Sequence, residues 1–351
     1  MMEELKALTA ARGISGEEDE ICALLRQKCE DAGASCRTDR LGSLLCSKEG
    51  PDARAPRVLL CAHMDEVGFV VLGAREDGLL RIAPVGGIDP RVAVSKGVLC
   101  GEKQLPGVIG AKAIHLQSAA DRARAPEFEK LFIDIGAKDQ AEAERLCPMG
   151  TYCTFDSALF ALGSCVAGRA LDDRVGCFNL LRALRHGYAG QLTCAFTVQE
   201  EVGLRGATVL SRRLDYDVAI VAEATSANDL GNTVQATQVC TLGKGVVISH
   251  MDRASIAYRP LRDAVEQLAV RRGIPWQPKR TATGGNDAGP LQRGAGAKPT
   301  VVLSVPCRNV HSPNCVVSLD DIAAQGDLLC ALLDELPALW MQIMKDEVTP
   351  Q

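Results

Sequence analysis

The sequence predicts an α/β fold, a three-layer sandwich with a mixed, largely parallel β-sheet, interrupted by a small β-rich insertion. Over residues 170–305, short apolar segments alternate with helical ones, as in parallel strands joined by crossover helices. The stretch 71–166 instead has short strand-like pieces divided by glycine and proline turns, which indicates a separate β-rich module. We therefore expect an α/β domain formed by 1–70 and 167–351, with an inserted domain at 71–166.

Two segments define the first part of the α/β domain. Ser15 and Glu18 have the Ser-x-x-Glu spacing of a capping box, and the apolar residues behind them follow helical spacing. A helix is therefore expected over 16–32. The continuous apolar run at 57–62 predicts a buried central strand, because such a strand has neighbours on both sides and both faces covered.

The remaining elements follow from the same patterns. In the α/β domain we expect strands at 191–198, 217–222 and 299–305, helices at 173–184 and 204–213, and a long amphipathic helix at 319–345. In the insertion we expect strands at 79–83, 95–101, 107–110 and 130–135, with 138–146 as its only helix.

Composition excludes several classes of protein. The 351 residues carry 39 Lys+Arg against 44 Asp+Glu, a net charge of −5, which argues against nucleic-acid binding. No apolar run approaches the ~20 residues of a membrane span. The acidic start lacks the basic-then-apolar pattern of a signal peptide. We expect a cytoplasmic protein that binds neither nucleic acid nor membranes.

The 15 cysteines are an odd number, and no two of them form a Cys-x-x-Cys pair. This excludes zinc-ribbon and thioredoxin-like motifs. Most lie inside apolar segments, as Cys61 and Cys194 do, where a free cysteine behaves as a small hydrophobic residue. We expect reduced, mostly buried thiols in a reducing compartment.

The first candidate catalytic residues directly follow the predicted strand at 57–62. His63 and Asp65 lie two residues apart, so in an extended backbone their side chains leave on the same side. A metal-binding histidine usually donates its second ring N–H to a carboxylate, and Asp65 is placed to accept it. A purely structural His-x-Asp pair is the alternative.

Acidic residues occur at the other predicted strand ends. Asp172 precedes a helix, where it either caps the helix or bridges two cations. Glu200 and Glu201 follow one apolar strand, and Glu223 follows the next. Adjacent carboxylates repel each other unless a cation or proton separates them, although an acidic helix start would give the same pattern at 200–201.

Together these positions predict a metal centre. His63, Asp172, Glu201, Glu223 and His311 supply two imidazoles and three carboxylates, nearly all at the sheet edge where α/β proteins bind ligands. Two first-row divalent cations need such nitrogen and oxygen ligands, with one carboxylate bridging them. Glu200 is then left as the general base for an activated water.

These residues lie in motifs that resemble, in order and over nearly the whole chain, the TET aminopeptidases. This is metallopeptidase family forty-two, which includes glutamyl and leucyl aminopeptidases. The matching segments are 13–18, 38–42, 62–68, 107–110, 132–137, 171–174, 198–203, 273–277, 284–288 and 310–313.

The resemblance implies a zinc-exopeptidase-like fold and a di-metal enzyme that removes N-terminal residues from peptides with a free N-terminus. It implies that one metal, usually zinc or cobalt, is bound by His63, Asp172 and Glu223, and a second by Glu201, Asp172 and His311. Asp172 would bridge the two metals. In the same way Asp65 would support His63, and Glu200 would be the base. The insertion would be a PDZ-like dimerisation domain, and dimers would assemble into a tetrahedral dodecamer.

Three positions depart from the family pattern. Glu223 stands where the family commonly has Asp, Asn286 where it has Thr, and Cys315 where it frequently has Glu. Two alternatives stay open, a non-peptide amidase or deacylase on the same site and a paralogue whose catalysis is impaired by these departures. Glycoside hydrolysis by paired carboxylates is disfavoured, because aromatic residues make up only 4% of the chain and sugar sites usually need aromatic platforms.

Overall fold

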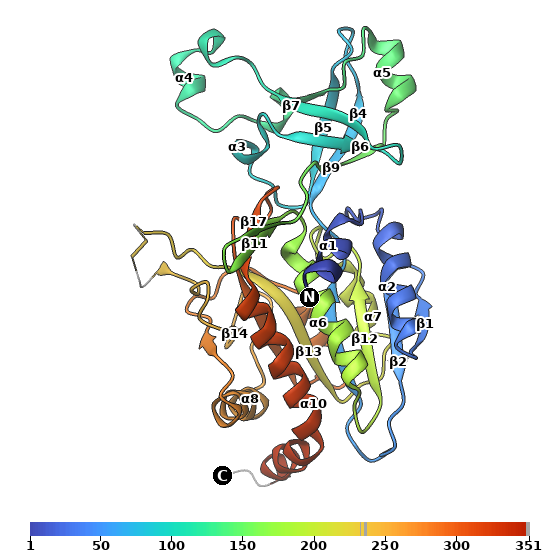
Figure 1. The fold of residues 1–351 in the computed structure, drawn as a ribbon, viewed down its shortest axis with the longest axis vertical. Coiled ribbons are helices and arrows are strands. Elements are labelled where there is room, and N and C mark those ends of the chain that lie inside the picture. The colour runs from blue at the N-terminus through green and yellow to red at the C-terminus, as the bar shows by residue number, and fades with distance from the viewer. Residues whose placement is uncertain (232, 235–236, 349–351) are drawn as a thin grey trace.

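The computed structural model describes residues 1–231, 233–234 and 237–348. Within these residues, eleven strands form one large sheet and six more close into a barrel. Figure 1 shows the barrel standing beyond one end of the large sheet, with long helices lying across the face of that sheet. The α/β architecture predicted from the sequence is confirmed.

The large sheet is mixed. Its order is β1-β2-β12-β3-β13-β16-β17-β11-β10, with β14 and β15 branching from β16. The four strands β12, β3, β13 and β16 run parallel at its centre, and the flanking pairs are antiparallel. The strand bounds are β1 Ser35–Thr38, β2 Leu44–Lys48, β3 Val58–His63, β10 Phe160–Leu162, β11 Cys165–Gly168, β12 Leu192–Thr197, β13 Val218–Ser226, β14 Val246–Ile248, β15 Trp276–Pro278, β16 Thr300–Arg308 and β17 Cys315–Ser318.

Helices cover both faces of this sheet. One face packs against α1 Met2–Ala10, α2 Asp19–Asp31, α6 Leu171–His186, α8 Arg259–Arg272 and α10 Leu319–Val348. The other face packs against α7 Arg205–Leu210 and α9 Ala288–Gln292. Every residue of β3 is buried, because a parallel central strand is enclosed by neighbours and by both helical layers. The C-terminal helix lies on the larger helical layer (Figure 1).

The barrel has a hydrophobic core of its own. In that core Phe69 meets Phe155 edge to face, with ring centroids 5.2 Å apart. Its strands are β4 Gly68–Ala74, β5 Leu80–Val85, β6 Gly97–Cys100, β7 Leu105–Gly110, β8 Phe132–Asp134 and β9 Tyr152–Phe155. The PDZ-like assignment and the boundaries 1–70, 71–166 and 167–351 stay predictions.

The barrel contains more helical turns than the sequence predicts. The expected helix at 138–146 is α5, Gln140–Leu146. The structure adds α3 Pro90–Ala93, α4 Ala119–Arg122 and two 3₁₀ turns, η1 Ile114–Leu116 and η2 Phe128–Lys130. Each of these is a single turn, too short for a hydrophobic period to reveal it.

The predicted capping box is wrong. Helix α2 begins at Asp19, and no side chain caps its N-terminus. Ser15 Oγ instead donates a hydrogen bond to Asp65 Oδ2 at 2.6 Å, and Glu18 Oε1 accepts from the backbone N–H groups of Gly16 and Gln199. Both side chains bind groups outside the helix, because the chain from 13 to 18 packs against the end of β3.

All 15 cysteines are free thiols, and most of them are buried. This agrees with the expectation of reduced, mostly buried cysteines. None of the described helices is both long enough and apolar enough to cross a membrane.

Candidate metal centre

The candidate site residues converge at the carboxyl edge of the parallel strands. His63 is the last residue of β3, Glu200 and Glu201 follow β12, and His311 lies in the loop after β16. Glu223 lies within β13, which continues four residues further than the sequence predicts. These side chains and Asp172 line a cleft of about 450 Å³, together with Gly87 from the loop that follows β5.

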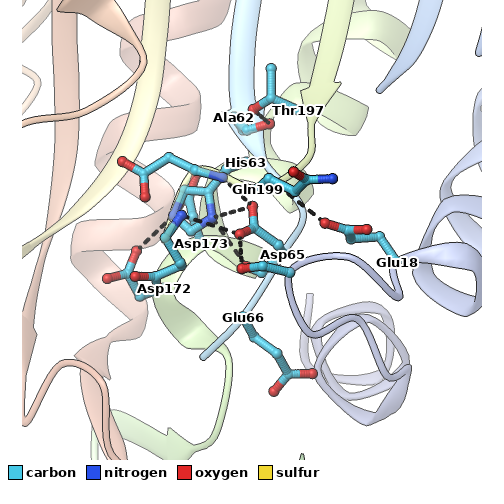
Figure 2. A network of polar contacts seen from close by, with 12 residues as sticks. Glu18, Ala62, His63, Asp65, Glu66, Asp172, Asp173, Thr197 and Gln199 are labelled. Atoms are coloured by element: carbon cyan, nitrogen blue, oxygen red, sulfur yellow. Dashed lines mark hydrogen bonds and ion pairs between the residues drawn. The ribbon is translucent and has the colours of Figure 1, made fainter. Parts of the chain in front are cut away.

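His63 is the buried centre of the group, with only 2% of its surface exposed. Its Nε2 lies 3.2 Å from Asp172 Oδ1 and 3.8 Å from Glu223 Oε2. On the other side of the ring, Nδ1 lies 3.1 Å from the backbone oxygen of Asp65 and 3.5 Å from Asp65 Oδ1. Figure 2 shows the ring between Asp172 and Asp65, with Glu66 pointing away.

His311 approaches the same group from the opposite side of Asp172. Its Nε2 lies 3.1 Å from Glu201 Oε2 and 3.6 Å from Asp172 Oδ2. Its Nδ1 lies 2.9 Å from the backbone oxygen of Gly87, which fixes the ring orientation. The two oxygens of Asp172 therefore face different imidazoles, Oδ1 toward His63 and Oδ2 toward His311.

The electrostatics show an excess of negative charge. Burial and neighbouring carboxylates raise the pKa of Glu200 and of Glu223 well above the ordinary value. Burial alone would lower the pKa of His311, but Glu201 and Asp172 outweigh it and raise the pKa to about 10. A cation among these carboxylates would favour their charged forms, as it does for the ligands of a metal site.

The donor set fits divalent cations. Glu223 Oε1, Asp173 Oδ2 and Asp287 Oδ1 are buried, and none of the three has a hydrogen-bond partner among the described residues. His63, Asp172 and Glu201 offer ligand atoms within 4.8 Å of one another, as do His63, Asp173 and Glu223. Imidazole and carboxylate ligands suit first-row divalent metals, so this cluster is a candidate metal centre.

Asp65 connects this cluster to the turn after β12. Its side chain is fully buried. It accepts hydrogen bonds from the backbone N–H groups of Glu200 at 3.0 Å and Glu201 at 3.2 Å, in addition to the Ser15 hydroxyl. Burial alone would raise the pKa of Asp65, but His63 and Ser15 hold it below the ordinary value. One carboxylate thus orients His63 and the two glutamates.

The structure reveals three acids that the sequence pattern did not identify as site residues. Glu18 binds the N–H of Gln199 and so supports the same turn as Asp65. Asp287 accepts a hydrogen bond from Thr197 beneath the site. Asp173 lies in the part of α6 whose backbone is not helical, and it accepts from the N–H of Gly176 at 3.0 Å. Of the acid pair at 172–173 it is therefore the second that caps the regular helical turns beyond it. The hydrogen-bond partners of these acids are either distant in the sequence or in the same turn. A hydrophobic period in the sequence therefore does not identify these three residues.

The structure shows the contacts of two of the three residues that depart from the family pattern. Asn286 lines the cleft, donates to Asp252 at 3.2 Å and accepts from the N–H of Ala288. Cys315 is buried beside the site, but its sulfur donates to the backbone oxygens of Asn309 and Ser312. The Cys315 sulfur is absent from the groups of potential metal ligands found in the described part of the chain.

Comparison with known proteins gives a consistent result. The sequence profile of the M42 glutamyl aminopeptidase family matches residues 42–328. The chain is 32% identical to the lysyl aminopeptidase of Pyrococcus furiosus, covering 95% of this chain and 97% of that protein. Among solved structures, a TET aminopeptidase from a marine sediment Thaumarchaeota archaeon matches with a TM-score of 0.91 at 31% identity, covering 96% and 98% of the two chains. The Pyrococcus horikoshii TET1 peptidase, which can assemble into a tetrahedron or a large octahedral shell, matches with a TM-score of 0.83 at 34% identity, covering 95% and 98%.

Proposed function

Because the chain belongs to the M42 glutamyl aminopeptidase family, we propose that it is a di-metal aminopeptidase that hydrolyses N-terminal residues from peptides. The observation that carries this proposal is the position of Asp172 between the two imidazoles. One oxygen lies 3.2 Å from His63 Nε2 and the other 3.6 Å from His311 Nε2. A carboxylate with each oxygen toward a different ligand suits a bridge between two cations.

The ligand assignment follows from these neighbours. His63, Asp172 and Glu223 would hold one cation, and Glu201, Asp172 and His311 the other. Zinc or cobalt fits the nitrogen and oxygen donors. Two such cations, when bound, would lower the pKa of a water and polarise the scissile carbonyl.

The protein residues would then handle the proton. Glu200 lines the cleft and is not needed as a ligand, so its carboxylate would accept a proton from the attacking water. The same carboxyl group would return that proton to the amine that leaves. The Asp65 carboxylate accepts a hydrogen bond from the backbone N–H of Glu200 at 3.0 Å and would thereby keep the base in position.

Hydrolysis of aminoacyl-anilides by the Zn²⁺- or Co²⁺-loaded protein tests the proposal. A chelator should abolish hydrolysis, and adding the metal back should restore it. Glu200→Gln should lower kcat by about 10²–10⁴-fold, as expected for the loss of a general base, without lowering the metal content. Glu76→Gln, which changes an exposed carboxylate of the barrel, should have no effect.

Other outcomes would favour the alternatives. Hydrolysis of acyl-amino acids without hydrolysis of any aminoacyl-anilide would indicate an amidase or deacylase on the same metal centre. Fewer than one tightly bound ion per chain, together with no activity on either panel, would indicate a catalytically impaired paralogue.

The proposal extends to location and assembly. We place the protein in the cytoplasm, as a homo-oligomer whose inserted domain forms dimers and whose dimers build a tetrahedral dodecamer. The inserted domain exposes apolar side chains, among them Val108, Ile114 and Leu116. Such exposure supports an interface with another chain. Light scattering coupled to gel filtration should give a mass near twelve chains, whereas a monomer would contradict this part.

A further inference from the structure

Three thiols converge at the β1–β2 edge of the large sheet, separated from β3 and its His63 by strand β12. Cys29 comes from α2, Cys36 from β1 and Cys46 from β2. Their three sulfur atoms all lie within 4.8 Å of one another, and the Cys36 and Cys46 sulfurs are 2.8 Å apart. None of these residues takes part in the proposed peptidase site.

The strand register brings the first two thiols together. Cys36 pairs directly with Cys46 across the antiparallel β1–β2 ladder, so both side chains leave on the same face of the sheet. Helix α2 covers that face and places Cys29 over the pair. Cys194 on β12 aligns with Cys46 in the next ladder, but its sulfur donates to the backbone oxygen of Leu180 and is not part of the three-thiol group.

The three thiols differ in their burial. Cys29 and Cys46 have 0% of their surface exposed, whereas Cys36 lies on the outermost strand and is half-buried. Cys36 is therefore the member of the group nearest to solvent, with the two fully buried thiols behind it. The Arg26 guanidinium donates to the backbone oxygen of Cys36 at 3.2 Å, which places positive charge beside the rim.

We propose that Cys29, Cys36 and Cys46 bind one thiophilic cation of the Zn²⁺, Cd²⁺ or Cu⁺ type. Zinc–thiolate bonds of about 2.3 Å in a tetrahedral site place the sulfurs about 3.8 Å apart. The observed separations, from 2.8 Å up to a limit of 4.8 Å, bracket that value. Sulfur ligands favour soft cations, and the half-exposed side of Cys36 leaves a fourth position for water. The cation would fasten α2 to the β1–β2 edge.

Binding must release protons. Burial raises the pKa of the Cys36 thiol, and the neighbouring Cys29 raises that of Cys46. Cys36 and Cys46 therefore each give a proton to water when they become ligands. The affinity should rise with pH for this reason.

Titration of the full-length, zinc-loaded enzyme with Cd²⁺ tests the proposal independently of peptidase function. Thiolate–cadmium bonds give an ultraviolet charge-transfer band that imidazole and carboxylate ligands do not give. The band should saturate at one Cd²⁺ per chain and disappear in Cys36→Ser. It should persist in Cys22→Ser, which removes another half-buried thiol from α2 outside the group.

Alkylation of the wild-type protein provides a measurement that needs no variant. Cd²⁺ should slow iodoacetamide modification of Cys36 without slowing that of Cys22, as read by peptide mass spectrometry. The proposal is overturned by the absence of a band, by a band that survives Cys36→Ser, or by unchanged alkylation of Cys36. A Cys36–Cys46 disulfide that forms in the presence of the cation also overturns it.

Discussion

Replacing Asp65 by asparagine tests the idea that one buried carboxylate positions both sides of the candidate metal centre. Asp65 accepts from the N–H groups of Glu200 and Glu201, one at each carboxylate oxygen, and from the hydroxyl of Ser15. It also faces His63 Nδ1 at 3.5 Å. An asparagine has one acceptor oxygen and one NH₂ donor, so at least one of the two backbone N–H groups would meet another donor.

The magnitude follows from these contacts. Hydrogen bonds to a charged group contribute about 1.5–3 kcal/mol each, and loss of the carboxylate behind a metal-binding histidine typically costs about 10–100-fold in metal affinity or activity. We expect Asp65→Asn to lower kcat/KM by about 10–100-fold, equivalent to about 1.4–2.8 kcal/mol. The metal concentration needed for half-maximal activity should rise as well.

The assay measures aminoacyl-anilide hydrolysis across a range of buffered metal concentrations, with circular dichroism as the check on folding. Ser15→Ala is the matched variant, because it leaves the carboxylate intact and removes one hydrogen bond. Its loss should be smaller, because the carboxylate still faces His63 and still accepts from both backbone N–H groups. The reasoning is refuted if Asp65→Asn stays within twofold of wild type at limiting metal, or if Ser15→Ala costs more than Asp65→Asn.

Three further predictions concern stability and the residue beside the site. Burial raises the pKa of Glu18 from 4.5 to about 7, so the folded state holds this proton more tightly than the unfolded state does. The free energy of unfolding should therefore fall by up to about 3 kcal/mol as the pH rises between those values. Glu18→Gln should therefore gain stability relative to wild type between pH 5 and pH 8 in urea unfolding, and a constant difference would contradict the assignment. Leu180→Ala, in the core of α6 with 0% exposure, should cost about 2–5 kcal/mol of unfolding free energy, whereas Met341→Ala, at 60% exposure, should change it by less than about 0.5 kcal/mol. Cys315→Ser should keep its metal content and activity within a few-fold, because the sulfur donates to backbone oxygens; loss of a bound ion would show that it is a ligand.

Much of the fold can be predicted from short stretches of the sequence. The apolar runs at 57–62, 191–198, 217–222 and 299–305 are β3, β12, β13 and β16, and their order in the sequence places polar residues where each strand leaves the sheet. His63, Glu201 and His311 could therefore be selected from the sequence alone, since parallel strands bring their carboxyl ends to one edge.

Local patterns failed where a side chain has a distant partner. The Ser15–Glu18 spacing fits a capping box, but in the structure both residues bind groups that come from other segments, at 65 and 199. A capping box and a long-range contact use the same residue types, and only the packing of the chain decides between them.

The sequence by itself determined the α/β fold class, the β-rich insertion and the residue types of the candidate metal centre, because strand and helix periodicity and strand-end polarity are encoded in neighbouring residues. The tertiary structure alone decided which oxygen of Asp172 faces which imidazole, which groups Asp65 orients, and that Cys36 meets Cys46. Those facts depend on strand register and on helix packing. Both are fixed by the burial of whole faces between segments far apart in the chain, and no local pattern records them.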